Sequence, residues 1–148
     1  MRSKLLSIQD AKPAERVFML VADPGEEAFD GIRAFAIDNG INAASVTAIG
    51  AFESATLAFF DVHTTRYMDI PIQEQSEVLS LVGDITLDEK GVPSPHLHAV
   101  LGFLDGRTRG GHFLKGIVKP TLEVVVRETP AELKRRFHPQ LGLALIDI

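Results

Sequence analysis

Three histidines, His96, His98 and His112, are the residues of this chain best suited to chemistry. Imidazole nitrogens bind zinc and other divalent transition metals, and the ligand type alone does not separate zinc from nickel or cobalt. The sequence contains no cysteine, so a metal here would be held by nitrogen and oxygen ligands. Structural zinc usually has all four positions closed by protein, whereas three histidines leave one open for water or substrate. The trio therefore predicts a zinc-type site that binds or converts a ligand.

The spacing around His96 and His98 predicts that both side chains lie on one face of a strand. They alternate with apolar residues that would form the opposite, core-facing side: Leu97, Ala99, Leu101 and Phe103. Two residues along a strand span about 6.6 Å, so the two imidazoles can lean together around one cation. The alternative interpretation is that each histidine packs or faces solvent without a ligand.

His112 joins this pair only if the following strand returns in the right register. We expect a three-residue loop, Asp105 to Arg107, to place His112 directly across from His98, whereas a two-residue loop would pair Ala99 with His112. Gly110-Gly111 adds the alternative of a bulge that re-aims the His112 side chain, a common device beside functional sites.

Glu123 follows His112 on the next stretch of strand and is the carboxylate that we expect as an extra ligand or as the catalytic proton carrier. An ordinary surface glutamate is the alternative for this residue. The two other histidines, His63 and His138, lie near turns, and we expect both to face solvent.

Two groups of basic residues are candidates for binding an anion or DNA. Arg107, Arg109, Lys115 and Lys119 surround the histidine hairpin, and Lys134-Arg135-Arg136 form a second run. A solvated surface is the default interpretation for both groups, and an anion site is the alternative. The formal net charge of -5 and the pI near 5.5 disfavour a polyanionic partner. A local patch would still act over a Debye length of about 8 Å at physiological salt.

The length of 148 residues suits a single domain, 1–148, that buries its core without disulfides. No run of about 18 uncharged apolar residues occurs, and the first residues lack the apolar core of a secretory signal. We therefore expect a cytoplasmic protein that does not span a membrane.

The pattern of apolar runs and turn residues predicts many strands and few helices. A long helix is expected after a cap at Asp23, with Pro24 in its first turn and a stop at Asn39-Gly40, and the capping box 129–132 predicts a short second helix at 133–137. A short break at 51–53 and the turn pair at 119–120 are expected to separate strands. The predicted strands are 16–22, 45–50, 54–61, 68–74, 77–87, 96–104, 112–118, 121–127 and 141–146. This content indicates an α+β fold, an antiparallel-rich sheet packed against one long and one short helix.

Several motifs in series resemble the prokaryotic PPC domain (plants and prokaryotes conserved), and the likeness extends over most of the chain. The motifs are Glu77 to Gly83, His96-Leu97-His98, Gly106-Arg107, Gly110-Gly111-His112, Gly116 and Thr121 to Val125. The resemblance implies a strongly bent antiparallel sheet and a homotrimer as the common assembly. It also implies the usual description of such proteins as candidate DNA-binding proteins.

The DNA description derives from plant relatives in which a separate Arg-Gly-Arg-Pro AT-hook reads the minor groove, and the sequence contains no such hook. The fold is also similar to that of acetolactate decarboxylase and related proteins, which hold zinc with a His-x-His pair and a later histidine. His96, His98 and His112 match those places, and Glu123 is a looser match. Fold similarity does not by itself transfer a reaction.

We therefore expect a homotrimeric PPC-type protein whose three histidines hold zinc or another divalent metal and which binds or acts on a small oxygen-rich ligand. The first alternative is a DNA-associated assembly module that uses the basic hairpin residues without catalysis. The second is a trimeric scaffold whose histidines have no ligand. Whether the protein is an enzyme is left open at this stage.

Overall fold

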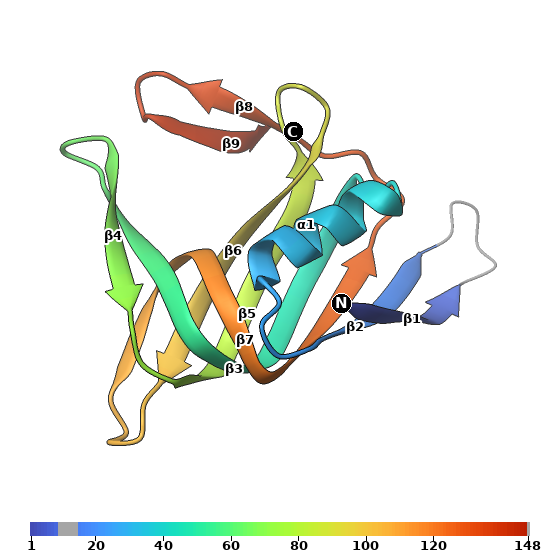
Figure 1. Ribbon diagram of the computed structural model, residues 1–148. Helices are drawn as coiled ribbons and strands as arrows, with labels where there is room; N and C mark the ends of the chain where they lie inside the picture. The colour runs from blue at the N-terminus through green and yellow to red at the C-terminus, as the bar shows by residue number, and fades with distance from the viewer. Residues whose placement is uncertain (9–14, 148) are drawn as a thin grey trace.

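Nine strands and one helix make up the part of the chain that the computed structural model describes, residues 1–8 and 15–147 (Figure 1). In chain order they are β1 (Arg2–Ile8), β2 (Arg16–Ala22), α1 (Ala28–Asp38), β3 (Ala43–Asp61), β4 (Arg66–Ile72), β5 (Ser76–Leu87), β6 (Pro93–Gly102), β7 (Thr108–Glu128), β8 (Lys134–His138) and β9 (Leu143–Asp147). None of the described helices is both long and apolar enough to cross a membrane.

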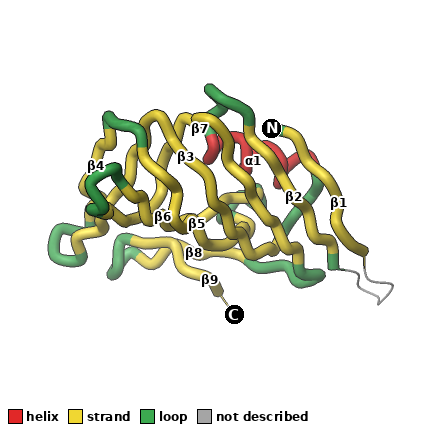
Figure 2. Tube along the Cα trace, turned by 90° about the horizontal axis from the view of Figure 1, so that it is seen from below, coloured by secondary structure: helices red, strands yellow, loops and turns green. Residues whose placement is uncertain are grey.

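All the strands belong to one sheet in the order β1-β2-β7-β3-β5-β8-β9, with β4 paired to β3 and with β6 paired to both β5 and β7. The pairings are antiparallel except for a single parallel contact between β5 and β8. Figure 2 shows the strands β4, β3, β7, β2 and β1 side by side, curving around α1. The expected α+β class with a strongly bent, antiparallel-rich sheet is confirmed.

The break expected at 51–53 is a bend within one strand. β3 continues from Ala43 to Asp61, and its pairing register with β7 shifts on both sides of Phe52. The separate strands expected at 45–50 and 54–61 are therefore wrong. Register shifts of this kind are β-bulges, which bend a strand and raise its local twist without ending it.

The turn expected at Lys119-Pro120 is also a bend, in β7, which runs from Thr108 to Glu128. Val118 pairs with Phe52 and Leu122 pairs with Gly50, so Pro120 lies in the irregular stretch between them. A proline has no N–H to donate to a ladder, and a bulge is where a strand can hold one. The two strands expected at 112–118 and 121–127 are one strand for this reason.

The helix α1 begins five residues after the expected cap at Asp23, because Glu27 serves as the N-cap. The Glu27 carboxylate accepts hydrogen bonds from the backbone N–H groups of Phe29 and Asp30. The stop at Asn39-Gly40 is confirmed, since Asn39 is the C-cap and Gly40 adopts a left-handed φ of +63°.

The core lies between α1 and the sheet face that it covers. The buried helix residues Ala28, Ile32 and Ala36 face the sheet, where Phe52 and Phe113 are fully buried and stack with centroids 5.4 Å apart. The opposite sheet surface, which we call the open face, exposes apolar side chains of β3, β5 and β6: Ile49, Leu79, Val82 and Val100.

The second helix expected at 133–137 is wrong, because Lys134–His138 form strand β8. Every residue of β8 pairs with β9, and the backbone N–H groups of Leu141 and Gly142 close the hairpin on the carbonyl of His138. A helix of five residues is too short to be stable without packing, and the neighbouring segment offers strand pairing instead. The final strand expected at 141–146 is confirmed as β9, Leu143–Asp147.

Candidate metal centre

The strand pattern of β6 turns two of the three histidines away from the core. Leu97, Ala99 and Leu101 are buried, whereas the alternating residues His96 and His98 face the other way and are half-buried and exposed. This is the period of two that a half-buried strand imposes. The expected face assignment of the His-x-His pair is therefore confirmed.

His112 on β7 lies directly across from His98, as expected, but the hairpin loop that sets this register differs from the predicted one. Gly102 is the last residue of β6 and pairs with Thr108, so the loop covers 103–107 and is centred on Asp105. A loop over 105–107 would have paired His112 with Val100. The loop begins earlier because the Phe103 N–H donates to the carbonyl of Arg107 and the Gly106 N–H to that of Phe103.

No register shift occurs between β6 and β7 at Gly110-Gly111, so a bulge there is not what aims His112. Gly111 instead permits close approach of a neighbouring strand. A Cβ atom on Gly111 would lie 2.6 Å from the backbone oxygen of Ala58 on β3, which is too close for any side chain. The glycine therefore lets β7 lie tightly against β3 beside His112.

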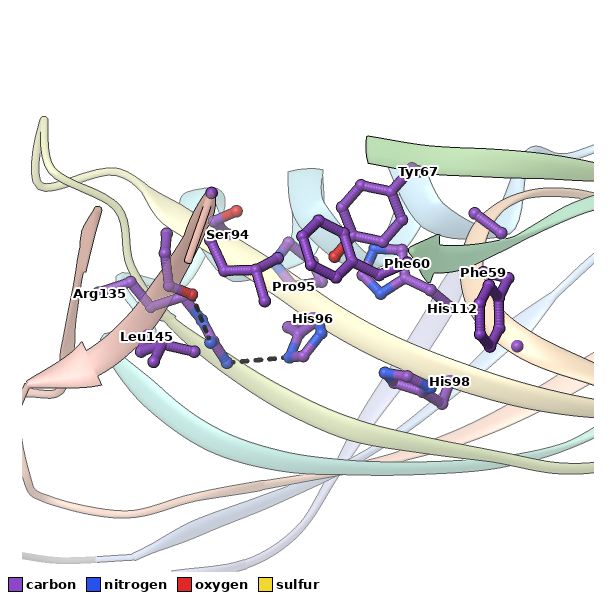
Figure 3. Close-up of a pocket in the computed structure, with 15 residues that line it drawn as sticks. Phe59, Phe60, Tyr67, Ser94, Pro95, His96, His98, His112, Arg135 and Leu145 are labelled. Atoms are coloured by element: carbon purple, nitrogen blue, oxygen red, sulfur yellow. Dashed lines mark hydrogen bonds between the residues drawn. The ribbon is translucent and has the colours of Figure 1, made fainter. Parts of the chain in front are cut away.

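The three imidazole rings converge on one point (Figure 3). Their centroids are 5.2 Å apart for His96 and His98, 4.9 Å for His96 and His112, and 5.3 Å for His98 and His112. One nitrogen of each ring lies within 4.8 Å of one nitrogen of each other ring. Nitrogens that share a tetrahedral zinc at about 2.0–2.1 Å are roughly 3.3 Å apart, so small side-chain rotations would close the set around an ion.

Two of the rings are held in the neutral form that a metal requires. The pKa of His112 is lowered to about 4, mainly by burial and then by electrostatic repulsion from His96, His98 and Arg135. Burial is also the main cause that lowers the pKa of His96, followed by the positive charge of Arg135. Neutral imidazole, unlike imidazolium, has a nitrogen lone pair that can bind a metal, so these shifts favour ligation at neutral pH.

His112 also carries a polar atom that has no partner in the described structure. Its Nδ1 atom is buried and accepts or donates no hydrogen bond among the described residues. Buried polar atoms of this kind usually have an explanation such as a missing ion. The donor set, its spacing and this unpaired nitrogen together fit a divalent transition metal.

An ion pair lies directly behind His96. Arg135 on β8 places its Nη2 atom 2.7 and 2.9 Å from the two carboxylate oxygens of Asp84 on β5, and 3.2 Å from Nδ1 of His96. Asp84 and His96 are paired across β5 and β6. The Arg135 side chain is only 12% exposed, so this contact belongs to the interior of the site.

A cavity of about 610 Å³ opens in front of the three rings. The end of β3 and the start of β4 supply one wall, with Phe59, Phe60 and Tyr67, and the β8–β9 hairpin supplies the other, with Arg135 and Leu145 (Figure 3). The Tyr67 ring lies 4.9 Å from that of His112. A small organic molecule can therefore reach the histidines from a mostly apolar chamber.

The other acidic and histidine candidates do not come together with the trio. Glu123 is exposed on β7 beside Ile49 and Leu79, in a shallow depression of the open face. His63 is exposed in the turn after β3, where its backbone N–H donates to the carboxylate of Asp61, and His138 is the last residue of β8. The described chain alone therefore does not bring Glu123 to the histidines.

The basic residues around the hairpin are partly neutralised by carboxylates. Arg107 forms ion pairs with Asp105 at 2.7 Å and with Glu74 at 3.0 Å. Lys119 forms one with Glu53 at 2.9 Å. Lys115 is exposed on β7, and the guanidinium of Arg109 lies 5.9 Å from the centre of the Phe103 ring. These partners weaken the case for a patch that attracts polyanions.

Sequence reasoning missed the residues that surround the trio. Arg135 was expected as part of a basic run and not beside the histidines, and Asp84 and Tyr67 were not expected in the site at all. Asp84, Tyr67 and Arg135 all come from strands other than β6 and β7, and the hairpin β8–β9 was itself not expected. Of these contacts, only the pairing of Asp84 with His96 could have been found from the sequence, because it follows from the correct register between β5 and β6.

Comparison with known proteins places the chain beside one family. The Plants and Prokaryotes Conserved (PCC) domain matches residues 9–130. A plant- and prokaryote-conserved (PPC) protein from Pyrococcus horikoshii is 27% identical and superposes with a TM-score of 0.84 over 98% of this chain and 95% of that one.

Two further solved structures are similar to this chain. A metal-containing protein from Archaeoglobus fulgidus is 33% identical, with a TM-score of 0.83 over 96% of this chain and 97% of that one. A protein from Bacteroides thetaiotaomicron, described as a candidate DNA-binding protein, is 29% identical, with a TM-score of 0.83 over 95% and 96% of the two chains.

One curated relative is much longer than this chain. The bifunctional protein GlmU of a Synechococcus strain is 33% identical over 127 residues, which are 84% of this chain but 18% of that protein. The chain therefore corresponds to a small part of this relative.

Proposed function

Because the chain belongs to the Plants and Prokaryotes Conserved (PCC) domain family, we propose that it is a metal-binding member of that family with an open three-histidine site. The ion is zinc or another divalent transition metal, and His96, His98 and His112 are its ligands. The site binds a small oxygen-rich ligand, or acts on one, in the cavity in front of the rings.

The convergence of the three rings carries this proposal. Their ligand nitrogens lie within 4.8 Å of one another at the base of the cavity, and the strand register aims them there without any bulge between β6 and β7. The description of the Archaeoglobus fulgidus relative as metal-containing supports a metal in this fold. Zinc with an open position can lower the pKa of bound water to about 7 or polarise a carbonyl, which favours an oxygen-rich ligand.

Zinc titration of the metal-free protein tests this proposal. We expect one equivalent per chain to bind to the wild type and to raise its melting temperature, because a ligand that binds only the folded state stabilises it. Failure of the folded, metal-free protein to take up zinc, nickel or cobalt would refute the proposal. Substitution of the exposed His63 by alanine is the matched control and should leave uptake unchanged.

We propose that the assembly is a homotrimer that covers the open face. The exposed apolar side chains of this face, Ile49, Leu79, Val82 and Val100, are 41–60% exposed in the single chain and belong to three adjacent strands. A cluster of exposed apolar residues is typical of an interface. The contact would also cover Glu123, which lies in the same surface and remains our candidate for a proton carrier.

A DNA-associated assembly module is the second candidate. The description of the Bacteroides thetaiotaomicron relative supports it, and Arg109 and Lys115 are the basic residues best placed to contribute. The net charge of -5 and the carboxylates beside Arg107 and Lys119 favour the metal-site proposal over this one.

A further inference from the structure

The hydrogen bond between Arg135 and His96 fixes where His96 carries its proton. The Nη2 atom of Arg135 lies 3.2 Å from Nδ1 of His96. A guanidinium has five N–H donors and no acceptor, so Nδ1 must accept this bond. A neutral His96 therefore carries its single hydrogen on Nε2.

Neither nitrogen of His96 is then free to bind a metal. The lone pair of Nδ1 is engaged by Arg135, and Nε2 carries the hydrogen. A ligand histidine normally donates its second N–H to a carboxylate, a backbone carbonyl or water behind it. His96 has the reverse arrangement in the described structure, because a donor lies behind it. Metal ligation through Nε2 thus requires Arg135 to leave Nδ1.

The carboxylate of Asp84 is the acceptor available after that change. Asp84 is the cross-strand partner of His96, and its two carboxylate oxygens now receive bonds from the same Nη2 atom of Arg135. One oxygen could accept the Nδ1–H of His96 while the other keeps Arg135. Asp84 would then be the carboxylate behind a ligand histidine, and its negative charge would also favour the ion.

The side chain of Arg135 can turn toward the cavity. It lines the cavity, and its Nε atom is buried with no partner among the described residues, while its Nη1 atom lies at a long 3.4 Å from the carbonyl of Ala144. A nearby metal cation would repel the guanidinium, whereas a ligand anion would attract both. Guanidinium groups pair with carboxylates through two parallel hydrogen bonds.

The rest of the cavity indicates what else the ligand carries. Phe59, Phe60, Tyr67 and Leu145 form walls of aromatic and aliphatic carbon, and no lysine, aspartate or glutamate is among the lining residues described. Such a chamber suits an apolar body, with its polar group directed at the histidines and Arg135.

We propose that Arg135 couples metal binding to the binding of a carboxylate with an apolar body. In the metal-free protein Arg135 occupies Nδ1 of His96. When the ion binds, Arg135 turns to the ligand carboxylate and Asp84 takes over Nδ1. This inference rests on the proposed function, and it makes the metal and the carboxylate each strengthen the other's binding by the same factor.

Nitrogen NMR of the histidine rings tests the first step in the wild-type protein, without any substitution. We expect His96 to be the Nε2–H tautomer in the metal-free protein and the Nδ1–H tautomer after zinc is added. Detection of the Nδ1–H tautomer in the metal-free protein would overturn the inference.

Zinc affinity, measured by competition with a chelator, tests the coupling. The proteins are the wild type, R135M and the control R136M, whose arginine pairs with Asp147 on the exposed side of the same hairpin. The probes are 3-phenylpropionate and its uncharged amide. Without a probe, we expect R135M to bind zinc about tenfold more tightly than the wild type. The reason is that the charged hydrogen bond from Arg135 to His96 no longer competes with the ion.

We also expect 3-phenylpropionate to tighten zinc binding by the wild type and by R136M about fivefold or more, which is the lower end of typical coupling. The amide should have no effect on any of the proteins. Neither probe should change the zinc affinity of R135M. Equal zinc affinities of R135M and wild type, or a carboxylate effect that persists in R135M, would overturn the inference and leave the metal site standing. Failure of the wild type itself to bind zinc would refute the proposed function and the inference with it.

Discussion

His98 on β6 and His112 on β7 are directly paired across the sheet, through a hairpin loop centred on Asp105. Directly opposed residues of an antiparallel pair have Cβ atoms about 4.5–5.5 Å apart and point to the same face. This pairing brings His112 to the two histidines of β6, and every proposal about the site depends on it.

The lowered pKa of His112 predicts a pH-dependent stability of the metal-free protein. The unfolded chain takes up a proton on this ring below about 6.5, whereas the folded protein does so only near 4. The free energy of unfolding should therefore fall as the pH decreases from 6.5 to 4, because the unfolded state binds more protons in this window. Urea unfolding of the wild type and H112N across this range measures the effect.

We expect the loss of stability over this window to be smaller in H112N, since the variant lacks the titrating group. The substitution H63A, at an exposed histidine, should keep the slope of the wild type. Parallel curves for the wild type and H112N would show that His112 is not held neutral by its surroundings.

Truncation of Phe113 should strongly destabilise the fold, because this ring is fully buried and stacks on Phe52. Loss of a buried phenylalanine side chain typically costs about 3–5 kcal/mol. We expect F113A to lie in that range by urea unfolding. The control F59A removes a ring that is 63% exposed and should change the free energy of unfolding by about 0.5 kcal/mol or less. A change in F113A as small as that in F59A would contradict the described core.

The proposed trimer contact predicts that a charge on the open face disrupts assembly. Ile49 is 60% exposed on this face, so I49E should shift the mass in solution from trimer to monomer, because burying an unpaired carboxylate is costly. Light scattering measures the mass directly. The control V62E places the same charge at a 70% exposed valine outside the open face. A wild-type monomer, or an I49E trimer, would exclude this face as the contact.

The DNA alternative predicts that a duplex binds at low salt and is released steeply as salt rises, since phosphate contacts displace counterions. The double variant R109A/K115A should then bind less well, while its zinc uptake stays that of the wild type. We expect no retention of duplex at physiological salt. Binding that survives physiological salt and disappears in the double variant would favour the DNA module.

The sequence predicted the centre of the site better than its surroundings. Alternation of histidine with leucine and alanine was enough to assign His96 and His98 to one face. The expected pairing of His112 with His98 is observed, but the expected loop at 105–107 would have paired His112 with Val100, and the observed loop begins two residues earlier, at 103. Strand periodicity is a local property, so it can be read from the chain. The resemblance to the PPC domain was confirmed by the family match, whereas the likeness to acetolactate decarboxylase stays a prediction.

The parts that could not be predicted depend on contacts between distant segments. Bends in β3 and β7 look like strand ends in the sequence, because a bulge and a turn use the same small residues and proline. The segment at 133–137 has the capping box of a helix but pairs with β9 instead, since tertiary pairing overrides a weak local preference. Arg135 consequently reached the site through an element that local patterns misassigned.

Elemental analysis of natively purified protein, beside the double variant H96A/H98A, tests the metal site most directly. We predict about one zinc, or another divalent transition metal, per chain in the wild type and none in the variant, with the variant still folded by circular dichroism. Absence of metal from both proteins, even after zinc is added, would contradict a three-histidine metal centre and leave the scaffold and DNA interpretations.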